Sequence, residues 1–177
     1  MRRGRNPLSE TRHRIASHIR THPGVHFNGL VRGLDLAPGQ VQHHLKALLA
    51  SDGVVAESLL GRTHYFPDGF DAWERRALAL LRRETARDIV VVLLDTGPAS
   101  PSTVVDRLGL ARSTLEWHLD RLVAVRLVEK MYDDRQHVTL AVARPQETAA
   151  LLGEADPTLL ETLADRYTRL VDRLLAD

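Results

Sequence analysis

The chain contains an internal repeat at an offset of 74 residues. The segment VQHHLKALLASDGVV, residues 41–55, returns as LEWHLDRLVAVRLVE, residues 115–129, and the alignment needs no gap. Identical positions are mostly apolar, as in the pairs Leu45 with Leu119 and Leu48 with Leu122, whereas the polar positions differ. We therefore expect two copies of one small fold that share a core and differ on the surface.

Each copy predicts three helices followed by a β-hairpin. The first copy has, in order, a helix capped by Ser9 and ending at Thr21, a short helix over about 27–34, a third helix from Pro38 to a left-handed cap at Asp52-Gly53, and strands VVAES and THYF around Leu60-Gly61-Arg62. The second has a helix from about Glu84 to Gly97-Pro98, a short helix opened by Ser100-Pro101, a third helix with a capping box of Ser113 and Glu116, and strands VEKMY and HVTLAV around Asp133-Asp134-Arg135.

This order of elements is that of a winged helix-turn-helix domain. The run LAPGQVQHHLKALLASDGVV, followed by GRTHYF, resembles the recognition helix and wing of the ArsR and MarR families of winged-helix regulators. The positions that carry the resemblance are Val41, His44, Leu45, Lys46, Leu48 and Gly53, whereas Gln42 replaces the usual serine. The tandem arrangement is similar to archaeal regulators with two winged helices. The resemblance implies a mainly α fold with small β-hairpin wings (α+β): two tandem winged helix-turn-helix domains plus a C-terminal helix.

The expected domain organisation has five parts. They are a basic arm over 1–8, a DNA-reading winged helix over 9–67, a linker helix over 68–83, a second winged helix acting as an interface over 84–143, and a helical dimerisation segment over 144–177. The spacing leaves open a single helix running from the linker into Ile89.

Charge is distributed unevenly between the two copies. Residues 1–66 contain nine Arg or Lys and four Asp or Glu, a net +5, whereas residues 67–177 have a net −4. The first part can therefore meet a polyanion that the second would repel. The sequence has no cysteine and no apolar run of the roughly 18 residues that cross a bilayer. An intracellular, cytoplasmic protein is the simplest interpretation.

The third helix of the first copy predicts a surface that reads double-stranded DNA. On a helical wheel Val41, Leu45 and Leu48 share one face. The polar residues that we expect in the major groove are Gln40, Gln42, His43 and Lys46. In the predicted wing Arg62, Thr63 and His64 are expected to contact the DNA backbone.

At the equivalent positions of the second copy Glu116 replaces Gln42, Trp117 replaces His43 and Asp120 replaces Lys46. Carboxylates would meet phosphates there, so Trp117 is expected in a protein interface instead. Two alternatives remain open. One is a winged-helix interaction scaffold in a transcription or assembly complex, and the other is a regulator with an effector near Trp73 and Trp117.

The C-terminal segment predicts a homodimer. Its apolar residues are spaced 3, 4, 3, 4, which is a heptad seam made of Leu160, Leu163, Tyr167, Leu170 and Leu174. A two-fold dimer would present two reading helices to half-sites about one helical turn apart.

No catalytic motif, cofactor site or metal site is expected. The histidines at 18, 22 and 26 are close in sequence, but no cysteine and few carboxylates accompany them. We expect a regulator without enzymatic activity, whereas its operator, its effector and the sign of regulation stay open.

Overall fold

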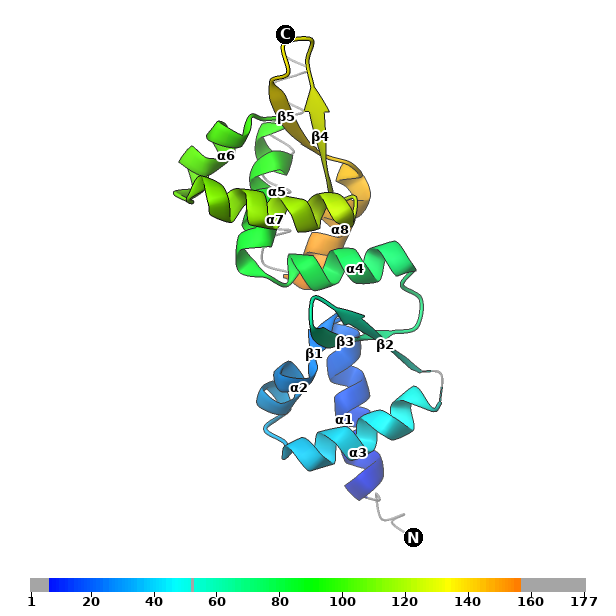
Figure 1. Ribbon diagram of the computed structural model, residues 1–177. Coiled ribbons are helices and arrows are strands. Elements are labelled where there is room, and N and C mark those ends of the chain that lie inside the picture. Colours follow the sequence, from blue (N-terminus) through cyan, green and yellow to red (C-terminus); the bar gives the residue numbers. More distant parts are fainter. Residues whose placement is uncertain (1–6, 52, 157–177) are drawn as a thin grey trace, which may run out of the picture. The chain divides into compact units, whose positions relative to one another are not determined.

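The computed structural model describes residues 7–51 and 53–156, which form two compact units that divide between Ala79 and Leu80 (Figure 1). Each unit has three helices followed by an antiparallel hairpin. The predicted fold class, mainly α with small β-hairpin wings in two tandem winged-helix units, is confirmed. The heptad residues from 160 to 174 and most of the basic arm lie outside the described residues.

The first unit has the element order of a winged helix. Its elements are α1 (Pro7–Thr21), β1 (Val25–His26), α2 (Phe27–Leu34), α3 (Pro38–Leu49), β2 (Val54–Leu59), β3 (Arg62–Pro67) and the greater part of α4 (Ala72–Leu81). The three strands form an antiparallel sheet in the order β1-β3-β2. Val25 pairs with Tyr65, and Leu59 pairs with Arg62 next to a two-residue turn.

Apolar side chains at helical and strand spacing form the core of this unit. They come from every element and comprise Ile15, Ile19, Val25, Leu30, Val41, Leu45, Leu48, Val54 and Tyr65. On α3 the buried positions lie three and four residues apart, as expected for one face of a helix. This burial orients α3, because turning the helix would expose Val41 and Leu45 to water.

Two boundaries differ from the sequence prediction. Helix α1 begins at Pro7 rather than after a Ser9 cap. Helix α3 ends at Leu49, and its C-cap Ala50 is right-handed, so the predicted left-handed cap at Gly53 is wrong. Ser51 donates from both its backbone N and its Oγ to the Leu48 carbonyl oxygen, at 3.2 and 2.9 Å. That carbonyl is satisfied without a glycine cap.

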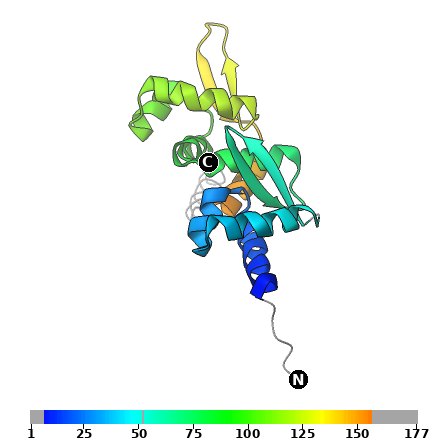
Figure 2. The same cartoon turned by 60° about the horizontal axis from the view of Figure 1, so that its bottom comes forward.

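The second unit repeats the plan with α5 (Glu84–Thr96), α6 (Pro101–Leu108), α7 (Arg112–Ala124), β4 (Val128–Tyr132) and β5 (Val138–Val142), followed by α8 (Pro145–Ala155). Both views show the β4–β5 hairpin projecting from the helices of its unit (Figures 1 and 2). A single bridge between Ala99 and Leu140 stands where the first unit has strand β1. Ala99 lies 74 residues after Val25, so the strand is reduced but stays in register.

Helix caps keep the same offset although the residues change. His26 caps α2 by accepting from the Gly29 amide, and Ser100 caps α6 by accepting from the Thr103 amide. Asp35 and Gly109 then end these helices in the left-handed conformation, with φ of 52° and 63°. The repeat is therefore one of backbone geometry, which different side chains satisfy.

The predicted capping box of Ser113 and Glu116 is wrong. Helix α7 begins at Arg112, and its N-cap Ala111 receives no side-chain hydrogen bond. Glu116 instead accepts from Lys130 on β4 at 3.0 Å. The helices α4 and α5 are separate, with a break at Arg82-Arg83. In the part of the chain that the structure describes, no helix is long and apolar enough to cross a bilayer.

Candidate nucleic-acid interface

The start of α3 is defined by Pro38 in the first turn and by extended backbone at the N-cap Ala37. Ala37 has no side-chain acceptor, and the Oε1 of Gln40 accepts from the Ala37 amide at 3.3 Å. The predicted role of Gln40 is therefore restricted. Its carbonyl oxygen is occupied by its own helix, and bidentate pairing with adenine would need that oxygen free.

The exposed face of α3 carries Gln42, His43 and Lys46. With respect to residues 7–51 and 53–156, the side chains of Gln42 and Lys46 make no hydrogen bond or ion pair. An amide and an ammonium group with their donors available are what contacts to base edges or phosphates require. The face predicted from the sequence is thus present and solvent-accessible.

The adjacent histidines on α3 have different environments. His43 is exposed, whereas His44 is buried, with 3% of its surface accessible. The rings meet edge to face, with centroids 5.1 Å apart. Burial, reinforced by His43 and Arg12, lowers the pKa of His44 and favours its neutral form. His118 on α7 stands 74 residues later, and burial lowers its pKa as well.

The wing turn of the first unit places Arg62 at an exposed position beside Leu60 and Gly61. These two residues have φ of 52° and 76°, which is the left-handed geometry of a tight primed hairpin turn. Thr63 is half-buried. Arg62 is thus available for a backbone contact, and Thr63 only partly so.

The predicted DNA contact of His64 is contradicted by the structure. Its side chain is buried, with 5% accessible surface, and its Nδ1 lies 2.8 Å from the carbonyl oxygen of Gly24. The ring also stacks with His26, with centroids 6.3 Å apart. His64 therefore joins β3 to the turn before β1 and cannot reach a phosphate without leaving the sheet.

An ion-pair group that the sequence prediction missed holds the wing strand β2. Glu57 on β2 accepts from the Nε of Arg75 at 2.7 Å and from the Nε of Arg76 at 3.2 Å, both on α4. Asp71 and Glu74 cap α4 reciprocally, at 2.7 and 2.8 Å. The D-x-x-E spacing signals this cap in the sequence, whereas nothing local connects Glu57 with residues 18 and 19 positions away.

The corresponding face of the second unit is built differently. Trp117 is 47% exposed, and the guanidinium of Arg121 lies over its ring. Glu116 is paired with Lys130, and Asp120 is exposed. This face therefore presents an aromatic ring and a carboxylate where α3 presents His43 and Lys46.

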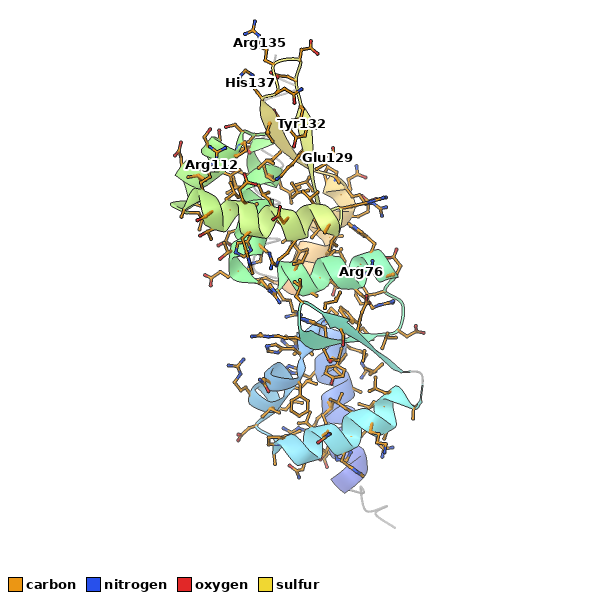
Figure 3. All side chains as sticks on the ribbon, in the orientation of Figure 1. Arg76, Arg112, Glu129, Tyr132, Arg135 and His137 are labelled. Carbon is orange, nitrogen blue, oxygen red and sulfur yellow. The ribbon has the colours of Figure 1, made fainter. Side chains whose placement is uncertain are left out.

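The hairpin tip of the second unit is organised by Asp133. Its Oδ1 accepts from the amides of Arg135 and His137, both at 2.8 Å, and its Oδ2 lies 2.9 Å from the His137 Nδ1. These hydrogen bonds, first the one from the His137 amide, lower the pKa of Asp133. Figure 3 shows Arg135 and His137 at the far end of the hairpin. The carboxylate closes the turn, which explains an acidic residue in this wing.

The histidines of α1 and its C-terminal turn do not form a metal centre. His18 and His22 stack with centroids 4.2 Å apart, and the Nδ1 of His22 contacts the hydroxyl of Thr21 at 2.9 Å. Within the described ranges, no group of three or more His, Cys, Asp or Glu residues is arranged to hold a metal ion.

Comparison with known proteins relates the first unit to a domain family. Residues 9–78 match the family model HTH_HVO_0163_N, described as an N-terminal HTH domain. A curated relative, an uncharacterised HTH-type transcriptional regulator of Methanocaldococcus jannaschii, is 26% identical over 122 residues. The match covers 69% of this chain and 31% of the relative, so the chain spans about a third of that protein's length.

Two solved structures are distantly similar. The crystal structure of RV1404 from Mycobacterium tuberculosis has a TM-score of 0.39 and 22% identity, covering 59% of this chain and 80% of that one. The endosomal complex ESCRT-II has a TM-score of 0.32 and 14% identity, covering 79% and 62%. The winged-helix assignment rests on the order and register of the elements described above. The chain is a tandem winged helix-turn-helix protein whose residues 9–78 match the model of an N-terminal HTH domain.

Proposed function

We propose that this protein is a sequence-specific regulator of transcription that binds double-stranded DNA through its first unit. The observation that carries the proposal is the exposed face of α3, where Gln42, His43 and Lys46 lie opposite a buried apolar face. Insertion of such a helix in the major groove brings these side chains to the base edges, while its core face stays packed.

Three further observations support the first unit as the DNA-binding part. Arg62 is exposed at the wing turn, and residues 1–66 have a net charge of +5. The match to an N-terminal HTH domain spans this unit, and the curated relative is named as a transcriptional regulator. Binding is expected to be electrostatic in large part, since released counterions drive association with phosphates.

The test is fluorescence anisotropy with labelled duplexes selected from a random pool, across a salt series. Lys46→Glu should abolish specific binding, because it places a carboxylate against phosphates or base edges. Arg112→Glu makes the same charge change at the exposed start of α7 and serves as the matched control, with a much smaller effect. Equal losses in the two variants, or no duplex binding by folded wild-type protein at low salt, would contradict the proposal.

A second candidate function is an interaction scaffold, which the half-exposed Trp117 of α7 favours. Under this alternative Lys46→Glu changes no measurable activity, and Trp117→Ala abolishes binding of a protein partner. The two functions are compatible if the first unit binds DNA and the second binds protein.

The proposed homodimer rests on the heptad spacing of the C-terminal residues. Sedimentation equilibrium of the full chain should show a dimer, and the double variant Leu163→Asp, Leu170→Asp should be monomeric. A wild-type monomer at micromolar concentration would overturn the dimer and leave the DNA-binding proposal standing.

A further inference from the structure

We propose that a hollow beside α3 in the first unit is a binding site for a small aromatic carboxylate, held between Tyr65 and Lys46. The hollow has a volume of about 740 Å³. This lies within the range of about 300–1,000 Å³ that is typical of small-molecule sites. All its lining residues belong to α2, α3 and β3 of the same unit.

The apolar part of the hollow suits a flat ring. It includes the rings of Phe27 and Tyr65, on two different elements, together with Leu45 and Leu49 of α3. Leu49 is 38% exposed, although it lies on the helix that is otherwise packed on the core. Aromatic side chains favour offset or edge contacts with a further ring, so an aromatic body is a better fit than a flexible polar one.

A buried hydroxyl supplies a specific polar contact. Tyr65 lines the hollow with 8% of its surface accessible. Among the residues that the structure describes, its hydroxyl has no hydrogen-bond partner, although buried tyrosine hydroxyls usually have one. Burial raises the pKa of Tyr65, so the hydroxyl keeps its proton and can donate.

The charge of the ligand follows from the rim. Gln42, His43 and Lys46 line the hollow, and its lining contains no carboxylate. Lys46 makes no ion pair with any described residue. An anionic group near Lys46 and Tyr65 would receive a charge-assisted hydrogen bond from each, which a neutral group would not.

The site has a regulatory consequence, and this part rests on the proposed function. Gln42, His43 and Lys46 are the same side chains that α3 would present to DNA. A carboxylate bound to Lys46 neutralises that cation and occupies the face, so ligand and duplex should exclude one another. By linkage, each would weaken the binding of the other to the same extent.

The experiment measures binding of 2-naphthoate, benzoate and indole-3-acetate to the full chain by equilibrium dialysis. The neutral isostere 2-naphthamide serves as a control for charge. Tyr65→Phe keeps the buried ring and removes only the hydroxyl, and we expect it to raise the Kd of 2-naphthoate about tenfold. Tyr132→Phe on the exposed strand β4 is the matched control and should not change the Kd.

A second variant fills the hollow without disturbing the fold. Gly39 lines it, and no atom lies within 4 Å of where its Cβ would stand. Gly39→Met should therefore be accepted by α3 and should abolish 2-naphthoate binding. Circular dichroism and thermal unfolding confirm that each variant is folded.

The outcomes separate the site from the proposed function. Saturable binding that Tyr65→Phe weakens and Gly39→Met abolishes supports the site, and release of a bound duplex by 2-naphthoate supports the regulation. Absence of saturable binding of all three acids, or equal binding of 2-naphthamide, overturns the site, even where the same preparation binds duplex. Binding of 2-naphthoate without any duplex binding supports the site and contradicts the proposed function instead.

Discussion

The guanidinium carbon of Arg121 lies 3.4 Å from the centre of the Trp117 ring, and its Nη1 donates to the Trp117 carbonyl oxygen at 2.6 Å. The two residues are one helical turn apart on α7, where i and i+4 side chains meet. One face of the exposed indole is therefore covered by a cation from its own helix. A protein that binds Trp117 has to accommodate this stacked arginine or displace it.

We predict that Trp117 and Arg121 are energetically coupled. Trp117→Ala and Arg121→Met should together destabilise the protein less than the sum of the single changes. The difference should be about 0.5–1 kcal/mol, the usual strength of an exposed cation–π pair. Urea unfolding followed by circular dichroism measures the cycle. Strict additivity would show that the stacked geometry contributes nothing in solution.

The turn at the first wing is expected to gain stability from a single substitution. Leu60 has φ of 52° and is 44% exposed, so it occupies a left-handed position without burying its side chain. Leu60→Asn should raise the free energy of unfolding by about 1 kcal/mol, because asparagine tolerates this backbone and Asn-Gly suits the turn.

The neighbouring glycine provides the opposite control. Gly61 has φ of 76° and open space around its missing Cβ, so Gly61→Ala tests the backbone alone. It should lower the melting temperature while Leu60→Asn raises it. A fall in both variants would mean that Leu60 contributes by packing rather than by conformation.

The ion pairs of Glu57 should contribute unequally. Glu57 and Arg75 are 19% and 21% exposed at 2.7 Å, whereas Arg76 is 54% exposed at 3.2 Å. Glu57→Gln should lower the free energy of unfolding by about 1–3 kcal/mol, since a partly buried charged hydrogen bond is lost. Arg76→Gln should stay within about 0.5 kcal/mol, as for most surface pairs.

These two variants differ further in their salt dependence. Chemical unfolding at low and high salt should show the Arg76 contribution screened and the Arg75 contribution largely kept. Equal effects of Glu57→Gln and Arg76→Gln would contradict the assignment of the Arg75 pair as the one that anchors β2 to α4.

Acidification should destabilise the first unit through His44. Burial lowers its pKa in the folded state below the ordinary value of 6.5, so the unfolded chain binds the proton more tightly. The stabilising contribution is complete above about pH 6.5 and is lost as the pH falls from there through the lower folded-state pKa. Thermal unfolding between pH 7.5 and 5 should show this decrease, and His44→Gln should reduce its slope.

A direct measurement follows the imidazole itself. The ring resonances of His44 should titrate below pH 6.5 in the folded protein, by nuclear magnetic resonance. Titration at or above that pH would show that the buried environment does not disfavour the charged ring. The control is a peptide spanning residues 38–49, in which the same histidine is exposed to water.

The element order could be predicted from residues close together in the sequence. Apolar spacing in α3, the proline at its first turn and the alternation in the hairpins are local signals, and each specifies an element through its own periodicity. The repeat at 74 residues then multiplied this information, because a pattern seen twice is less ambiguous than one seen once. Helix ends were predicted less well, since Ser51 replaces the expected glycine cap through a hydrogen bond.

Exposure of the candidate DNA-binding residues was only partly determined by the sequence. Gln42, His43 and Lys46 follow from the helical wheel, because the apolar stripe of α3 dictates which side remains in water. His64 does not follow, since a polar residue in a short strand next to a turn looks solvent-exposed until its partner is known. That partner, the carbonyl of Gly24, lies 40 residues earlier in the chain.

The sequence by itself thus determined two copies of a three-helix and hairpin fold and the polar face of each third helix, because short-range periodicity controls both. Only the tertiary structure decided that His64 is buried, that Glu57 anchors the wing strand to α4, and that Phe27 and Tyr65 meet beside Lys46 in a hollow. These relationships join residues far apart along the chain, and packing of α2, α3, β3 and α4 brings them together. No local pattern encodes such distances, so they become visible only when the core is assembled.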